Sequence, residues 1–361
     1  MIKSPFGIIK NSIRILTINI LIILSILLVL EIGFRLAFPE FKNHIHSADL
    51  TLNKKVHFRD IYGQFVRAEN SVEQIIDKDG TILVFGDSIS YGYGHGYHDI
   101  WWKQLERLLK IRNKNYKFIS ISKHGTTLAD YIENIFDVVD KIESNERILS
   151  KVIYQFNFND IQPERRSSLK KDDVIGDNFT FAKWRYKHLN KSVFARVIQH
   201  QAGILKRKTS GTCENRGLNA LEAYTWTFGA KHAIVESEIY WEKFSKDLID
   251  LNNYLKNKNI KFEVLLAPIL FQIDKIGYHP YYNRENLDFK CGTIDPIEKL
   301  NKLTSDNMIH IYNPIEYVHS SFMDRVIDEN FEPFFFTTDH NHFTPIVSGY
   351  IADFMTTEWK D

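Results

Sequence analysis

The sequence predicts an α/β domain, with a parallel sheet covered by helices on both faces, that follows one apolar helix long enough to cross a membrane. From residue 79 onward, short apolar runs alternate with amphipathic stretches, as they do where crossover helices join parallel strands. Before them, residues 15–30 carry no charge. The composition, 44% hydrophobic and 25% charged over 361 residues, is that of a folded globular chain.

The apolar segment extends from Ile15 to Phe38 and would measure ~36 Å as a helix, enough to cross a hydrocarbon core of ~30 Å. Lys3, Lys10 and Arg14 precede it. The positive-inside rule then keeps the N-terminus in the cytoplasm and exports the remainder. We therefore expect residues 1–40 to form a single-pass anchor, with the following domain on the extracytoplasmic side.

A cleaved signal peptide is the alternative interpretation of this segment. Its apolar stretch is long for a signal peptide, and cleavage after Ala37 would require a small residue where Arg35 stands. Glu31 and Arg35 lie one turn apart near the exit of the helix, where they can pair and reach the interface. These features favour an uncleaved anchor.

Five short apolar runs predict the strands of the sheet, at 81–85, 117–121, 152–156, 262–267 and 309–312. Apolar residues at helical spacing predict four helices, at about 100–109, 128–139, 237–257 and 345–357. Trp101 and Trp241 fall in two of these helices, so we expect them in the core rather than on a sugar-binding face.

Two segments interrupt this alternation. Residues 41–78 are polar and lack a clear period, and we expect a stalk that leads into a domain over 79–361. Residues 164–235 separate the third and fourth strands and are interpreted as a partly helical insertion. Its basic stretch, 183–191, is typical of a solvated face, and a contact with anionic headgroups or an acidic glycan is the alternative.

Charge and cysteine content exclude several classes of protein. Lys and Arg total 46 against 45 Asp and Glu, for a net charge of +1, so no footprint for nucleic acid is present. The glycine-rich loops that cradle nucleotide phosphates do not occur. The two cysteines, Cys213 and Cys291, are too few for a four-cysteine zinc site. Whether they form a disulfide in an oxidising compartment stays open.

The strongest chemical signal follows the first strand, in Gly86-Asp87-Ser88 with Gly92 and Gly94 shortly after. Ligands of doubly wound sheets bind at the carboxyl ends of the strands. A Ser at that end, after a Gly that permits a sharp turn, presents its hydroxyl near the N-terminus of the next helix. Ser88 is therefore the candidate nucleophile, although a plain turn or helix cap accounts for the same residues.

Two further residues follow the next strands. Gly125 follows the second strand and Asn159 the third, and with the Ser88 amide they can donate hydrogen bonds to a developing oxyanion. His95 and His124 lie near the glycines and are expected as polar lining or surface. Gly125 and Asn159 can each also be explained as turn residues. Together with Ser88, however, they occur in order at the ends of successive predicted strands, which is not expected by chance.

The last signal, Asp339-His340-Asn341-His342, stands just before the last helix. His342 is the candidate general base for Ser88, and Asp339, three residues earlier, can orient its ring and stabilise the imidazolium. His340 is expected to point elsewhere. An HxH pair can also bind a metal, but without a convincing third ligand we expect none.

With these residues the sequence resembles the GDSL, or SGNH, hydrolase superfamily. The match lies in Ser88 of GDSIS, Gly125 of HGTT, Asn159 of NFND, and Asp339 with His342 of DHNH. The resemblance covers about 79–361 and implies a three-layer α/β/α fold with a five-stranded parallel sheet of order 2-1-3-4-5. It also implies an acyl-enzyme at Ser88 without metal or cofactor. Members are esterases, lipases, thioesterases and carbohydrate O-deacetylases, with some acyltransferase relatives.

One block departs from the family pattern, because Asn157 replaces the Gly of the usual GxND. A side chain there is expected to narrow the acyl pocket or displace Asn159, which affects rate and chain-length preference more than reaction class.

Three functions fit these residues. The first is a membrane-anchored serine esterase that cleaves an O-acetyl or short acyl ester on an envelope glycan or a lipid. The second is an O-acyltransferase that uses the same triad with a sugar hydroxyl as acceptor. The third is a non-catalytic glycan-binding module, which the intact set of Ser88, Asn159, Asp339 and His342 argues against.

Overall fold

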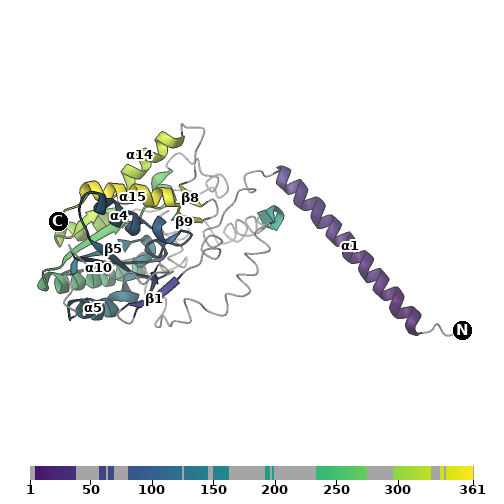
Figure 1. Cartoon of the computed structure of the whole chain (residues 1–361), viewed down its shortest axis with the longest axis horizontal. Helices are drawn as coiled ribbons and strands as arrows, with labels where there is room; N and C mark the ends of the chain where they lie inside the picture. The colour runs from purple at the N-terminus through teal and green to yellow at the C-terminus, as the bar shows by residue number, and fades with distance from the viewer. Residues whose placement is uncertain are drawn as a thin grey trace. The chain divides into compact units, whose positions relative to one another are not determined.

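The computed structural model describes residues 5–37, 57–61, 64–68, 80–123, 126–144, 149–161, 192–195, 197–198, 233–274, 296–326, 334–336 and 339–360. The chain divides into two compact units (Figure 1). The first comprises residues 1–44 and 178–209, and the second comprises 45–177 and 210–361.

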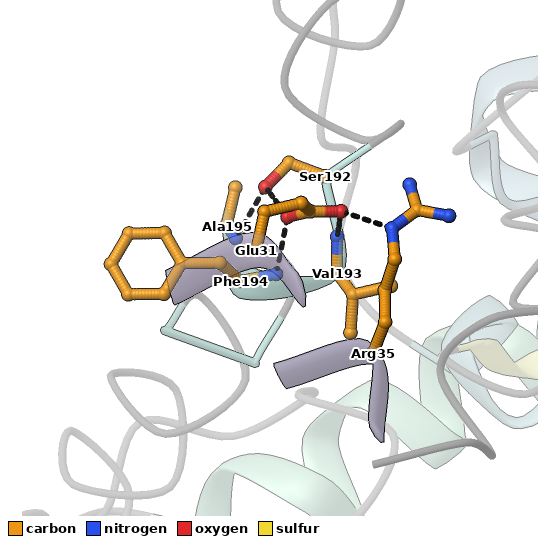
Figure 2. Close-up of polar contacts among 6 residues, drawn as sticks. All are labelled: Glu31, Arg35, Ser192, Val193, Phe194 and Ala195. Carbon is orange, nitrogen blue, oxygen red and sulfur yellow. Dashed lines mark hydrogen bonds and ion pairs between the residues drawn. The ribbon is translucent and has the colours of Figure 1, made fainter. Parts of the chain in front are cut away.

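The first unit contains helix α1 (Pro5–Ala37), as the apolar segment predicts. Its portion from Ile15 to Ala37 is long and apolar enough to cross a membrane, and none of it is buried. A signal sequence passes the same test of length and composition. Residues 192–195 and 197–198, from the predicted insertion, belong to this unit and bind the C-terminal part of α1 (Figure 2).

The second unit is built on a five-stranded sheet in which every neighbouring pair of strands is parallel. Its strands are β3 (Thr81–Gly86), β4 (Lys117–Ser122), β5 (Leu149–Phe156), β6 (Lys261–Leu266) and β7 (His310–Tyr312). Their order is β4-β3-β5-β6-β7, which confirms the order 2-1-3-4-5 and all five predicted strands. Every residue of β3 is buried, as expected of a central strand covered on both faces.

Helices cover both faces of this sheet, which completes the three layers (Figure 1). On one face α4 (Trp101–Ile111) packs against α15 (Pro345–Glu358), and on the other α5 (Leu128–Ser144) packs against α10 (Ala233–Asn257). These are the four predicted helices. Trp101 and Trp241 are 0% and 5% exposed, so both belong to the core, as predicted.

Several elements were not anticipated from the sequence. Helix α13 (Pro296–Asp306) lies between β6 and β7 in the chain, and α14 (Ile315–Val326) follows β7. The predicted stalk contains an antiparallel hairpin of β1 (His57–Ile61) and β2 (Gln64–Ala68). A second hairpin pairs β8 (Phe335–Phe336) with β9 (Asp339–Phe343). The DHNH motif therefore lies in a strand.

Some expectations fall on parts of the chain that lie outside the described residues. These are the possible disulfide between Cys213 and Cys291 and the basic stretch 183–191.

Candidate active site

The glycine that ends β3 is required by the packing of the neighbouring strand. A Cβ atom on Gly86 would lie 2.6 Å from Gln155 Oε1 and 3.0 Å from Gln155 Cβ. Gln155 is buried in β5, and its Oε1 accepts hydrogen bonds from Ser90 N and Ser90 Oγ at 3.1 and 2.9 Å. Any side chain at position 86 would therefore displace a group that holds the turn after Ser88.

Ser88 begins the short helix α3 (Ser88–Tyr91), directly after the carboxyl end of β3. The Asp87 side chain caps this helix by accepting from Ile89 N at 2.9 Å. Gly92 ends it with φ of 76°, a left-handed conformation that favours glycine. The sequence GDSISYG thus encodes a tight, capped turn that presents Ser88.

Two indole groups hold the same turn from the side. Trp101 Nε1 donates to Ser90 Oγ at 3.1 Å, and Trp102 Nε1 donates to Ser90 O at 2.8 Å. Both rings are almost completely buried. The loop that carries Ser88 is therefore fixed by the first residues of α4 as well as by β5.

The structure brings together Ser88 and His342, which are 254 residues apart in the sequence. His342 Nε2 lies 2.7 Å from Ser88 Oγ. Ser88 is 6% exposed, and the ring of Tyr93 lies against the His342 ring with a centroid distance of 4.9 Å. When the hydroxyl donates to Nε2, the neutral imidazole carries its proton on Nδ1, which is the tautomer that a general base for Ser88 requires.

A second histidine holds the strand that carries His342. His95, which is 2% exposed, donates from Nε2 to Phe343 O at 2.8 Å, and its Nδ1 lies 3.3 Å from Ser348 Oγ. The sequence suggested only polar lining or surface for His95. Its position between Gly94 and Gly96 was the available signal, but the partner, 248 residues away, could not be read from the chain.

The loop after β4 is tied to the end of β3. Tyr131 OH donates to Gly86 O at 2.9 Å, and it accepts from Lys123 N at 2.7 Å. Thr126 Oγ1 lies 2.7 Å from the same hydroxyl. Burial raises the pKa of Tyr131, so this hydroxyl keeps its proton. Gly125, the predicted oxyanion donor, lies outside the described residues between these two anchor points.

The residue that departs from the family pattern has a clear partner. Asn157 is 6% exposed, and its Nδ2 donates to Asp87 Oδ2 at 3.0 Å. Its backbone N donates to Asp160 Oδ2 at 2.7 Å. The Asn157 side chain thus joins the third block to the residue before Ser88. Asn159 follows β5 in the short helix η3 (Phe158–Ile161), but its side chain lies outside the described set.

Two buried carboxyl groups lie near the turn that carries Ser88. Asp87 and Asp160 are 1% and 2% exposed. Burial, followed by the negative charge of Asp87, raises the pKa of Asp160 well above its ordinary value. Asp160 is therefore protonated and neutral over an extended pH range, which limits the negative charge below Ser88.

The remaining predicted residues lie in β9. The backbone of Asp339 and His340 belongs to this strand, but their side chains are outside the described set. Within the described residues, no group of three His, Cys, Asp or Glu side chains is arranged to hold a metal.

Comparisons with known proteins give no family model that matches the chain and no curated protein that matches it. Solved structures do match. One is the acetyl xylan esterase AlAXEase, at 14% identity and TM-score 0.40, covering 78% of this chain and 100% of that one. Another is the psychrotrophic esterase EstA from Pseudoalteromonas sp., at 14% identity and TM-score 0.36, covering 77% and 96%. A third is a catalytic mutant of an acetylxylan esterase from Geobacillus stearothermophilus, at 11% identity and TM-score 0.41, covering 79% and 96%.

Proposed function

We propose that this chain is a membrane-anchored serine esterase, with Ser88 as nucleophile and His342 as general base. The observation that carries the proposal is the 2.7 Å separation of Ser88 Oγ and His342 Nε2. Both atoms lie beyond the carboxyl end of a central strand, where doubly wound sheets bind ligands. A hydroxyl and an imidazole at this distance form the pair that serine hydrolases use.

The reaction follows from this pair. Ser88 Oγ attacks the acyl carbonyl carbon as His342 Nε2 takes its proton. The tetrahedral intermediate collapses, the bond to the alcohol oxygen breaks, and the imidazolium returns the proton to that oxygen. Water then loses a proton to His342 Nε2 and attacks the carbonyl carbon of the acyl-Ser88 ester. As this second tetrahedral intermediate collapses, the bond between the carbonyl carbon and Ser88 Oγ breaks, the imidazolium returns the proton to Ser88 Oγ, and the carboxylic acid is released.

The other roles come from the sequence motifs. We assign Asp339 to orient the His342 ring, as a carboxylate does in other triads. The backbone amides of Ser88 and Gly125, with the Asn159 side chain, would donate to the oxyanion. The anchoring of the loop after β4 to Gly86 through Tyr131 supports the assignment of Gly125, since it holds that loop against the end of β3.

The site residues need neither metal nor cofactor for this reaction. We assign an acetyl or short acyl ester, carried by a glycan or a lipid, as substrate. The apolar length of α1 and the basic residues Lys3, Lys10 and Arg14 before it support a single-pass anchor with the catalytic unit on the extracytoplasmic side.

The proposal is tested by hydrolysis of p-nitrophenyl acetate and p-nitrophenyl octanoate with the full-length protein in nanodiscs. Ser88→Ala and His342→Ala should each abolish turnover, whereas Ser305→Ala, an exposed serine on α13, should leave kcat unchanged. Asn159→Ala should lower kcat by ~10²–10³ if its side chain donates to the oxyanion. Unchanged turnover in Ser88→Ala would contradict the nucleophile.

A further inference from the structure

The exit of α1 carries a carboxylate that is bound from outside the helix. Glu31 accepts hydrogen bonds from Ser192 Oγ at 2.6 Å, Val193 N at 3.0 Å and Phe194 N at 3.1 Å, and it pairs with Arg35 Nε at 2.7 Å (Figure 2). Four donors to one carboxylate are strong, charge-assisted contacts. They attach a segment from the predicted insertion, residues 192–195 and 197–198, to the last turns of α1. We call it the docked segment.

Apolar contacts add to this attachment. The rings of Phe34 and Phe194 meet edge to face with a centroid distance of 5.1 Å. Val193 and Val197 are 0% and 5% exposed, and Phe34 packs against them. The docked segment therefore binds α1 with both polar and apolar groups over about one helical turn, from Glu31 to Arg35.

The depth of this contact follows from the length of α1. The apolar portion, Ile15–Ala37, has 23 residues, or ~34 Å against a hydrocarbon core of ~30 Å. Glu31 and Phe34 lie six and three residues before Ala37, which is ~9 and ~5 Å along the axis. When α1 spans a bilayer, these side chains lie near the boundary between acyl chains and headgroups.

A lone carboxylate at that boundary would be costly, because it loses water without gaining partners. The donors of the docked segment and Arg35 supply those partners. The docked segment must therefore reach the same depth as Glu31.

The docked segment also keeps apolar surface that α1 does not cover. Ile198 is 49% exposed, and Phe194 is partly exposed. Directly before Ser192, the sequence 183–191 combines Trp and Tyr with four Lys or Arg residues. Aromatic and basic residues together are typical of chain at the headgroup level.

We infer that the docked segment is a second contact with the membrane, in which Ile198 and Phe194 meet lipid at the interface and Glu31 holds the segment there. The inference rests on the proposal that α1 spans the membrane. It is independent of the proposed chemistry at Ser88.

The experiment places a fluorescent bimane label on single cysteines of the full-length protein, in a background with Cys213→Ser and Cys291→Ser. The protein is reconstituted in phosphatidylcholine vesicles that carry nitroxide near the headgroup or at the middle of the acyl chain. The labels replace three exposed isoleucines: Ile198 in the docked segment, Ile23 in the middle of α1 and Ile111 at the end of α4.

We expect the headgroup nitroxide to quench the label at position 198 more strongly than the mid-chain nitroxide does. At position 23 the mid-chain nitroxide should quench more strongly. The label at position 111 should be quenched little by either. Glu31→Gln should lower quenching at 198 and leave that at 23 unchanged, while Glu358→Gln, an exposed matched control, should change neither. A quenched label at 23 with an unquenched label at 198, or equal quenching at 198 and 111, would overturn the inference. An unquenched label at 23 would instead overturn the membrane span.

Discussion

Buried polar groups that take no part in the proposed reaction hold Ser88 in position. Asp87 caps the turn, Asn157 donates to Asp87, and Gln155 binds Ser90. The motif that the sequence resembles predicts a Ser in this place, but it does not predict Gln155 and Asn157 as partners. Gln155 lies in β5 and Asn157 directly after it, more than 60 residues from the groups that they bind. Asn157, which stands where the resembled motif has Gly, has its side chain held by the hydrogen bond to Asp87.

His95 is expected to act as a positioning residue for the base. His95→Ala removes the donor to Phe343 O, so the strand beside it can shift and His342 loses its alignment with Ser88. We predict that kcat for p-nitrophenyl acetate falls about tenfold to a hundredfold, since small displacements of a catalytic group cost this much. KM should change little.

The conservative variant His95→Gln should restore part of the rate, because its amide can donate to the same carbonyl. His98→Ala, an exposed neighbour, is the control and should retain wild-type kcat. If His95→Ala lowers the melting temperature and the total activity but leaves kcat per folded molecule unchanged, His95 has only a structural role.

Asp160 should make stability depend on pH. Its folded pKa is raised above the ordinary value of 3.8 by burial and by Asp87, so the folded state binds a proton that the unfolded state has released. The stability that this proton provides is complete below the unfolded pKa and is lost as pH rises through the folded pKa. Asp160→Asn, which still accepts from Asn157 N, should flatten this decline in the unfolding free energy. Urea titrations at several pH values measure it, and an unaltered slope would contradict the assignment.

At the scale of elements, the strands were the most predictable part of the fold. β3 is mostly apolar and every residue in it is buried, and β4 centres on the apolar run Phe118, Ile119 and Ile121. Such short runs between helical patterns leave little ambiguity. The β8–β9 hairpin could not be predicted, because β8 has two residues within a run of aromatics and no alternation. Its position depends on long-range contacts such as that between His95 and Phe343.

A buried ion pair joins β5 to β6 near their amino ends, away from Ser88. Lys151 Nζ lies 2.7 Å from Glu263 Oε1, with side chains 3% and 6% exposed, and Tyr312 OH donates to Glu263 Oε2 at 2.9 Å. Lys151→Met should lower the unfolding free energy by about 3–5 kcal/mol, because it leaves a buried charge unpaired.

The double variant Lys151→Met/Glu263→Leu should recover most of that loss, since apolar replacement of a buried pair is often neutral or better. Chemical denaturation measures both changes, and kcat of the folded protein should stay at the wild-type level. A double variant less stable than Lys151→Met would show that the pair is not the cause of the loss.

For the whole molecule, the sequence predicted a helix long and apolar enough to cross a membrane, the sheet order and the pairing of Ser88 with His342. It could not predict that the insertion contributes a segment to α1, because Glu31 and Ser192 are 161 residues apart and only their proximity in the fold reveals the contact. Glu31 and Arg35 were expected to pair, and they do. That pair alone did not indicate that Glu31 also binds the segment that begins at Ser192.

A fluorophosphonate probe, which reacts with activated serines, examines whether Ser88 is the nucleophile of an acyl-enzyme. The full-length protein in nanodiscs is incubated with the probe, digested, and examined by peptide mass spectrometry. We predict one adduct, on Ser88, that is absent from Ser88→Ala and forms far more slowly in His342→Ala. An adduct on another residue, or none on a folded protein that hydrolyses p-nitrophenyl acetate, would show that Ser88 is not the nucleophile.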